Sequence, residues 1–325
     1  MAEYIGIKGS TIQTIAGDPA NPIAGQVWYN STATTLKAYG QQGTGAWASG
    51  GTLNTGRGSM GSAGTNTAAL AIGGNASGDF VESYDGSTWT ELAANLPTPT
   101  AYLFGLGTQT AALAGGGTGG SGSAVNYTWN ATSWTTNNAM ATARTGLGGT
   151  GTTTAGLIMG GQNPGKVANT ETYNGTTWTE VNNLNTALSY DSAGGTQTAA
   201  LRVFGSTPPN TALIEEWDGT CWTEVADLNQ ARASTSSASG QGTVTAMLAI
   251  GGSSPATPAN TVNCEQYNGT SWTEVGNLAL GRSNGAGGGT SLAAFTTAGS
   301  SVSSDSLTST EIWSTPNAIK TFTSS

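Results

Sequence analysis

An eight-residue pattern recurs four times in the chain: an aromatic residue, an Asn-Gly or Asp-Gly pair, two small residues and Trp-Thr-Glu. The copies span residues 84–91, 173–180, 217–224 and 267–274. An Asn-Gly or Asp-Gly pair between aromatic and β-branched residues predicts a β-hairpin, because both residues tolerate the positive φ of a two-residue type I′ turn. Each copy is therefore expected to form one hairpin, repeated along the chain.

The expected register of this hairpin gathers large and charged side chains. With a two-residue turn at residues 174–175, Tyr173 would lie opposite Thr176. Glu171 would then lie opposite Trp178. Two aromatics and two carboxylates on one face would need a packing partner and a cation. Since side chains alternate between the faces of a strand, that face would carry Glu171, Tyr173, Thr176, Trp178 and Glu180.

Trp residues divide most of the chain into units of similar length. They follow one another at intervals of 42 to 50 residues, at Trp47, Trp89, Trp134, Trp178, Trp222 and Trp272. A second aromatic follows an Ala-rich segment in each unit, at Tyr84, Tyr127, Tyr173, Trp217, Tyr267 and Trp313. An Arg stands ten residues after four of the Trp, at Arg57, Arg144, Arg232 and Arg282. A period of this length with four strand signals per unit is typical of β-propeller blades.

The order of these landmarks resembles the kelch-type β-propeller repeat, in which small residues end the second strand and an aromatic ends the third. A Trp then opens the fourth strand and an Arg follows it. The resemblance covers residues 47–313 and implies an all-β fold, with a single propeller of four-stranded blades. Four positions depart from the pattern. Ser206 stands where a second Gly is expected, Ala298 stands where the first Gly of a pair is expected, and Pro99 and Leu188 stand where Arg is expected.

Six units predict six blades. The ring would close by pairing the strand at Trp47 with the strand at Trp313, which removes an exposed sheet edge. A seventh blade is the alternative, built from the strands at Val27, Leu36 and Trp47 and one more strand from residues 4–15 or 319–323. The expected domains are an extended N-terminal arm (1–24), a β-meander that serves as attachment element or as part of a closing blade (25–46), the propeller (47–313) and a C-terminal tail (314–325).

Eleven of the eighteen acidic residues occupy repeated positions. A carboxylate required for catalysis would occur once, whereas one required for packing would recur in each unit. We therefore expect the repeated Arg to reach the Glu-bearing face of an adjacent blade, because a half-buried charge is costly unless it is paired. Five of these acids lie two residues before the second aromatic: Glu82, Glu171, Glu215, Glu265 and Glu311.

Composition narrows the chemistry further. The chain has no His, which removes the Ser-His-Asp triad and every His metal site. Cys221 and Cys264 stand where other units carry small residues, so they are expected to be fillers rather than metal ligands, with a disulfide as the alternative. No catalytic residue, metal or cofactor is predicted, and the protein is expected not to be an enzyme. A two-carboxylate glycosidase would have to use acids outside the repeat: Asp79, Asp191, Asp227 and Asp305.

The net charge and the hydrophobic pattern of the chain restrict the kind of partner that it can bind. A formal net charge of −9 with only nine Lys and Arg argues against a nucleic-acid partner, which would require a basic surface. No run of about 18 apolar residues is present, so no insertion into a membrane is expected. The first residues lack a basic segment followed by an apolar core, so no secretory signal is expected either.

The N-terminal meander carries a second resemblance. Gly25 to Asn30, followed by Leu36 to Tyr39 and Trp47, is similar to a Gly-x-x-Trp-Tyr-Asn, Leu-Lys-x-Tyr and Trp meander in structural proteins of tailed, marine bacteriophages. The resemblance implies a virion protein of the tail, fibre or capsid surface, assembled in the host cytoplasm. Its N-terminal segment would dock onto other virion proteins, within a homo-oligomeric or otherwise symmetric assembly.

An adsorption protein that binds a glycan or protein on the host surface is the alternative function. The loops between second and third strands vary most in length among the units, and variable loops on a rigid scaffold are common binding sites. The candidate binding residues in these loops are Asp79, Phe80, Asn163, Lys166 and Asn210.

Overall fold

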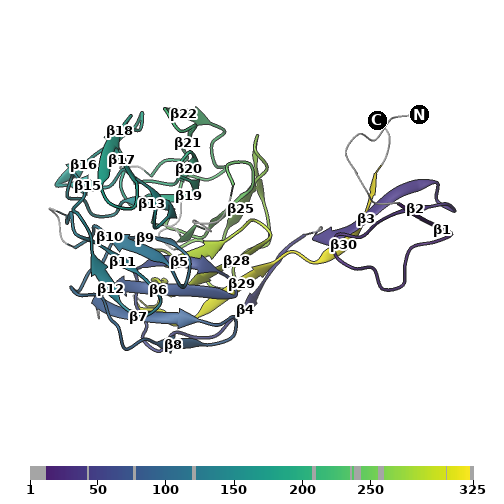
Figure 1. Ribbon diagram of the computed structural model, residues 1–325, viewed down its shortest axis with the longest axis horizontal. Helices are drawn as coiled ribbons and strands as arrows, with labels where there is room; N and C mark the ends of the chain where they lie inside the picture. The colour runs from purple at the N-terminus through teal and green to yellow at the C-terminus, as the bar shows by residue number, and fades with distance from the viewer. Residues whose placement is uncertain are drawn as a thin grey trace. The chain divides into compact units, whose positions relative to one another are not determined.

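The computed structural model describes residues 12–41, 44–75, 78–118, 122–206, 210–234, 236–237, 243–254, 260–304 and 306–322. Within these ranges the regular secondary structure is entirely β (Figure 1). The chain divides into two compact units. The larger unit comprises residues 46–313, and the smaller comprises residues 1–45 together with 314–325.

The larger unit contains six four-stranded sheets arranged as blades, numbered here first to sixth in chain order. The first has β5 (Gly61–Thr65), β6 (Ala68–Gly74), β7 (Gly78–Tyr84) and β8 (Trp89–Glu91). The second has β9 (Phe104–Gly107), β10 (Ala112–Gly115), β11 (Asn126–Trp129) and β12 (Trp134–Thr136). The third has β13 (Gly148–Thr152), β14 (Ala155–Met159), β17 (Thr170–Tyr173) and β18 (Trp178–Val181). A two-stranded sheet of β15 (Gln162–Asn163) and β16 (Gly165–Lys166) extends the loop between β14 and β17.

The remaining three sheets follow the same plan. The fourth has β19 (Ser192–Thr196), β20 (Ala199–Val203), β21 (Ile214–Trp217) and β22 (Trp222–Val225). The fifth has β23 (Ser236–Ser237), β24 (Met247–Ile250), β25 (Cys264–Tyr267) and β26 (Trp272–Glu274). The sixth has β27 (Ala286–Gly289), β28 (Ala293–Thr297), β29 (Thr310–Ser314) and, from the beginning of the unit, β4 (Ala46–Ser49).

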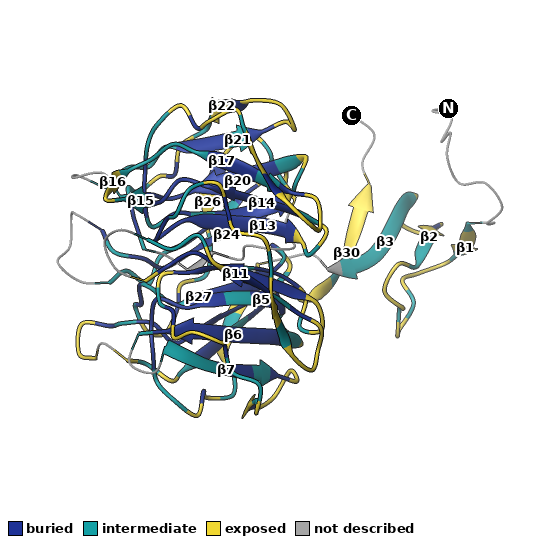
Figure 2. Ribbon diagram, turned by 60° about the vertical axis from the view of Figure 1, so that its left-hand side comes forward, coloured by how far each residue is buried: buried dark blue, intermediate teal, exposed yellow. Residues whose placement is uncertain are grey.

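The core lies between neighbouring sheets. The second strands β10 and β24 are buried along their whole length, which explains why they carry Ala, Leu, Ile and Met on both faces. Figure 2 shows the second strand β6 in the dark blue of buried residues along most of its length. Each of six hydrophobic clusters among the described residues joins two successive sheets, and one of them joins the sixth sheet to the first. The first strands contact one another in the order β5, β9, β13, β19, β23, β27 and again β5. Trp47 of β4 packs against Trp313 of β29, with ring centroids 5.4 Å apart.

The smaller unit is one four-stranded sheet, in the order β1 (Gln13–Ile15), β2 (Val27–Asn30), β3 (Thr35–Gln41) and β30 (Asn317–Phe322). Residues of the expected arm, meander and tail thus share a sheet, separate from the six sheets of the larger unit. Trp28 is fully buried in it. Asp18 accepts hydrogen bonds from Trp28 Nε1 and Asn30 Nδ2, and forms an ion pair of 2.8 Å with Lys37. Residues 1–11 of the expected arm lie outside the described residues.

The repeated hairpin has a different turn from the one predicted. Tyr173 pairs with Trp178 and Glu171 with Glu180, so four residues connect the strands. Asn174 Oδ1 accepts hydrogen bonds from the amides of residues 176 and 177, and Gly175 has a φ of +90°. The two-residue turn was therefore wrong, because the Asn side chain organises a longer loop. The rings of Tyr173 and Trp178 lie 4.7 Å apart, on the same face as Glu171 and Glu180.

Two landmarks of the repeat lie at other residues than predicted. Trp129, rather than Tyr127, is the aromatic paired with Trp134, so Tyr127 stands at the position that holds Glu in the other sheets. In the fourth sheet Phe204 and Gly205 occupy the two positions that Gly160 and Gly161 occupy after the second strand of the third sheet. The residue that departs from the pattern is therefore Phe204, and not Ser206. Phe204 takes a φ of +68°, where the third sheet has Gly160 with a φ of +64°.

Candidate functional site

The repeated Arg are buried and ion-paired. Each lies on the connection that enters a sheet and contacts the Glu on the third strand of that sheet, so it joins two successive sheets. The guanidinium nitrogens lie 2.6–2.9 Å from the carboxylates in the pairs Arg144–Glu171, Arg232–Glu265 and Arg282–Glu311. Arg57 pairs with Glu82 in the same way. The predicted pairing is confirmed.

Two sheets lack the repeated Arg, and each avoids an unpaired buried carboxylate in a different way. In the fourth sheet, where Leu188 stands, Arg202 of β20 reaches Glu215 at 2.9 Å. In the second sheet, where Pro99 stands, Tyr127 occupies the Glu position and no carboxylate needs a partner. Arg and Glu are thus kept or lost together, because either charge alone would be buried without compensation.

The candidate binding loops contain residues with structural contacts. Lys166 Nζ donates a hydrogen bond to the carbonyl of Ser206, and Asn210 Nδ2 donates one of 3.1 Å to the carbonyl of Ser253. Both bonds reach from one sheet to the next. Asn163 lies in β15, and its strand pairs with β16. Asp79 and Phe80 are the second and third residues of β7 and are half-buried. These five residues belong to three different sheets, and none lines the cavity described next.

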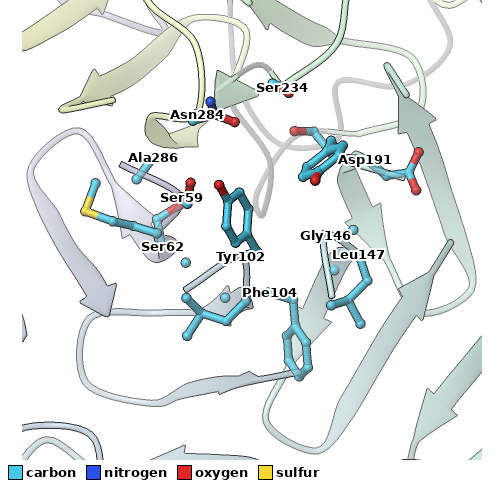
Figure 3. A pocket seen from close by; sticks show the side chains of 18 of the residues that line it. Ser59, Ser62, Tyr102, Phe104, Gly146, Leu147, Asp191, Ser234, Asn284 and Ala286 are labelled. Carbon is cyan, nitrogen blue, oxygen red and sulfur yellow. The ribbon is translucent and has the colours of Figure 1, made fainter. Parts of the chain in front are cut away.

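A cavity of about 100 Å³ opens where the connections enter the first strands (Figure 3). Six residues line this cavity, and each stands two positions before the beginning of a first strand. All six have a φ between 54° and 62°. We call them the axial belt: Ser59, Tyr102, Gly146, Tyr190, Ser234 and Asn284.

Backbone hydrogen bonds link the axial belt from sheet to sheet. The amide of Tyr102 donates to the carbonyl of Ser59 at 2.7 Å, and that of Gly146 to the carbonyl of Tyr102 at 2.9 Å. The amide of Tyr190 continues the series by donating to Gly146 at 2.7 Å. From the other side, the amide of Asn284 donates to Ser234 at 2.6 Å, and the amide of Ser59 donates to Asn284 at 2.7 Å. The last bond joins the first sheet to the sixth.

The conformation of the axial belt favours glycine, yet only Gly146 is one. A left-handed φ costs a residue with a Cβ about 1–2 kcal/mol, and it is a clear outlier for a bulky residue such as Tyr. The turn itself is satisfied by glycine, as the third sheet demonstrates. The Ser and Tyr side chains at four of the other positions are therefore retained against a conformational cost, whereas Asn284 tolerates this conformation. Such strain is common at functional sites.

The two tyrosines of the axial belt contact each other. Their ring centroids lie 5.7 Å apart with an interplanar angle of 68°, which is an edge-to-face arrangement. Tyr102 keeps 37% of its surface exposed. Gly146 lies between them in the chain, and a Cβ there would stand 3.2 Å from Cδ1 of Tyr190. The small residue leaves room for the tyrosine pair at the mouth of the cavity.

Asp191 lines the cavity with its backbone side but directs its carboxyl elsewhere. Figure 3 shows its carboxyl pointing away from Tyr102. The side chain is fully buried, 3.9 Å from Arg202, and accepts one hydrogen bond of 3.3 Å from the amide of Gly161. Burial raises the pKa of Asp191 to about 7, against the attraction of Arg202. Its charge is thus directed into the protein rather than into the cavity.

The other acids proposed for a glycosidase do not join Asp191. Asp79 lies on β7 and Asp227 is exposed, and neither lines the cavity. Asp305 lies outside the described residues. Within the described ranges no cluster of three metal-ligating side chains is found. Cys221 is exposed and Cys264 buried, and both are free thiols. None of the described segments forms a helix suited to crossing a bilayer.

The axial belt was missed in the sequence because its residue types differ from sheet to sheet. The one regular signal is spacing. Five belt residues stand two positions after the repeated Arg or its equivalent, as Ser59 does after Arg57 and Tyr190 after Leu188. Tyr102 stands three positions after Pro99, which hides the alignment.

Comparison with known proteins identifies a fold but no family. No protein-family model matches the chain, and no curated protein matches it in sequence. Among solved structures, "Structure of YjhT" matches with a TM-score of 0.69 and 12% identity. The match covers 83% of this chain and 99% of YjhT. At this identity the likeness shows the β-propeller architecture alone.

Proposed function

We propose that this protein is a non-enzymatic component of a bacteriophage particle. The smaller unit attaches it to other particle proteins of the tail, fibre or capsid surface, and the propeller is displayed outward. The observation that carries the attachment is the apolar surface of the smaller unit. Within its described residues, Trp28 is the single buried hydrophobic side chain, while four large apolar side chains stay exposed: Ile23, Tyr29, Ile319 and Phe322.

A sheet with so small a core is expected to gain stability from a partner. Ile23 exposes 75% of its surface, and Phe322, on the edge strand β30, exposes 40%. The meander in this unit is also the segment that resembles phage structural proteins. A particle with symmetric copies of one receptor site would supply such a partner for each chain.

We further propose a six-bladed ring, completed by β4 in the sixth sheet. The cyclic contacts of the first strands, the hydrophobic cluster between the first and sixth sheets, and the hydrogen bond from Ser59 to Asn284 support this number. A seventh blade is disfavoured, because β4, which carries Trp47, completes the sixth sheet beside β29, and the sheet of β1, β2, β3 and β30 belongs to the smaller unit.

The distribution of carboxylates supports a non-enzymatic role. Glu on the third strands are ion-paired in five sheets, and the Asp191 carboxyl turns away from the cavity. Glycoside hydrolysis by the usual mechanism requires two carboxyl groups that face the same bond. The described residues around the cavity do not provide that pair.

The test is to ask whether the protein belongs to particles. Particles from cells that produce the protein would be banded in a density gradient and probed with antibodies against residues 46–313. We expect the protein in the particle band. Its presence in the soluble lysate together with its absence from the particle band would overturn the proposal.

A pair of matched variants tests the attachment surface. Ile23 and Val302 are both 75% exposed, the first in the smaller unit and the second in the larger. Ile23→Asp is expected to lower incorporation into particles, whereas Val302→Asp should leave it unchanged. Equal incorporation of both variants would contradict attachment through the smaller unit.

A further inference from the structure

We infer that the axial belt is a binding site for a neutral carbohydrate, with Tyr102 as the aromatic platform and the polar groups of the belt as hydrogen-bond partners for sugar hydroxyls. The inference concerns the propeller alone and holds whether or not the protein is carried by a particle. It also moves binding away from the variable loops, where Lys166 and Asn210 are engaged in contacts between sheets.

The first argument is conformational. All six belt positions are left-handed, and Gly146 shows that glycine suffices for the turn. If the turn alone mattered, glycine would serve at every position. Ser and Tyr side chains instead stand at four of the other positions at a conformational cost, and Asn, which tolerates the left-handed region, stands at the fifth. Side chains kept at a cost around one opening are expected to contact something in that opening.

The second argument is the chemistry of the lining. The belt side chains offer two phenol hydroxyls, two serine hydroxyls and one carboxamide. The hydroxyl of Ser62 close by already donates to the carbonyl of Gly287 at 2.7 Å, so it could only accept a hydrogen bond from a ligand. Among the described residues that line the cavity no Lys or Arg occurs, and the one carboxyl, that of Asp191, points elsewhere. A polar but uncharged lining matches a ligand rich in hydroxyl groups better than an anion or a cation.

The third argument is the exposed aromatic surface. Tyr102 is held by the edge-to-face contact with Tyr190, so its ring has a defined orientation while 37% of the residue stays accessible. Within the described part of the chain, the phenol hydroxyls of both tyrosines have no hydrogen-bond partner. A rigid ring whose hydroxyl is not committed to another protein group provides an apolar face for the C–H side of a sugar and a polar group for its edge.

The size of the cavity defines how much of the ligand enters. A volume of about 100 Å³ is small beside the roughly 300–1,000 Å³ of pockets that enclose a whole drug-sized ligand. Only one edge of a terminal sugar fits inside, and the remainder would lie on Tyr102 at the mouth. The site therefore suits the end of a glycan chain rather than its interior.

The experiment measures binding of defined sugars to the full-length protein. Glucose, galactose, N-acetylglucosamine and lactose would be tested by saturation-transfer NMR and calorimetric titration, with N-acetylneuraminic acid as the anionic comparison. Tyr102→Gly and Tyr190→Gly are suitable variants, because glycine adopts the left-handed conformation freely and the fold should survive. Tyr102→Asn adds a variant that keeps a polar side chain but lacks the ring.

Ala131→Gly is the matched control. Ala131 also has a left-handed φ, of +74°, but it lies in the turn between β11 and β12 and does not line the cavity. We expect at least one neutral sugar to bind the unaltered protein and Ala131→Gly equally. Binding should weaken at least about tenfold in each tyrosine variant, while thermal unfolding stays cooperative. No binding by any neutral sugar, preference for N-acetylneuraminic acid, or unchanged binding by the tyrosine variants would overturn the inference.

Discussion

Arg202 reaches Glu215 from within the same sheet, yet its guanidinium occupies the position that an incoming connection fills elsewhere. Its Nη1 donates to the carbonyls of Phe204 and Leu213, and its Nη2 donates to Glu215. Arg144 donates to two equivalent carbonyls and to Glu171. The protein therefore holds a guanidinium at this position whichever strand supplies it.

Removing Arg202 should be strongly destabilising. Arg202→Met removes the cation that pairs with the buried Glu215, for which we expect a loss of about 3–5 kcal/mol in the free energy of unfolding. Arg202→Met combined with Glu215→Gln should recover a large part of that loss, since the uncompensated charge is gone. Urea unfolding of the single and double variants measures both. Equal stability of the two variants would contradict the role of the pair.

The source of the guanidinium should be exchangeable. Leu188→Arg alone would bring a second cation beside Arg202, and we expect it to destabilise the protein. Leu188→Arg together with Arg202→Leu recreates the arrangement of the other sheets and should regain stability. The midpoint of thermal unfolding compares the three proteins. If the double variant is no more stable than Leu188→Arg, the two positions are not equivalent.

Asp191 should make stability depend on pH. Its pKa is about 7 in the folded protein and near the ordinary 3.8 when unfolded, because burial disfavours the charged form. The folded state then binds more protons, so this contribution is complete below about pH 4 and is lost as the pH rises through 7. A pKa difference of about three units corresponds to about 4 kcal/mol in the free energy of unfolding.

Asp191→Asn is the variant that isolates this effect. The amide cannot ionise, so the variant should lose less stability between pH 5 and pH 8 than the unaltered protein does. Denaturant unfolding at several pH values measures the two slopes. Parallel slopes would show that Asp191 titrates normally in the folded state.

The two thiols should differ in reactivity. Cys221 is exposed in a hairpin turn, whereas Cys264 is fully buried and burial raises its pKa to about 11. A thiol reagent should modify Cys221 in the native protein, slowed by the neighbouring Asp218, which raises the pKa of that thiol. Cys264 should react only as the protein unfolds. Mass spectrometry after timed labelling distinguishes them, and equal rates would contradict the burial of Cys264.

The sequence was most informative where packing imposes the same residue in every unit. The Trp period and the Arg–Glu pairs predicted the sheets and their ion pairs because each sheet must bury the same core and neutralise the same charge. The hairpin register failed because Asn174 competes for backbone amides, an effect that the Asn-Gly pair alone does not reveal.

The candidate site could not be predicted from the sequence, for a different reason. The axial belt is defined by backbone conformation, and its members range from Gly146 to Tyr190, so no residue type marks it. The loops chosen for their variable length do contain Lys166 and Asn210. Their polar groups are committed to neighbouring sheets, which only the tertiary structure reveals.

The placement of the Arg–Glu pairs also has a consequence for how such a chain can grow by gene duplication. Arg144 and Glu171 lie on one continuous stretch of chain, between one landmark Trp and the next. A copied Trp-to-Trp segment would inherit both partners, although the stretch begins in one sheet and ends in another. A copied sheet would inherit Glu without its cation. The heritable module is therefore offset from the structural one, and Arg202 shows how a single substitution within a sheet can repair the mismatch.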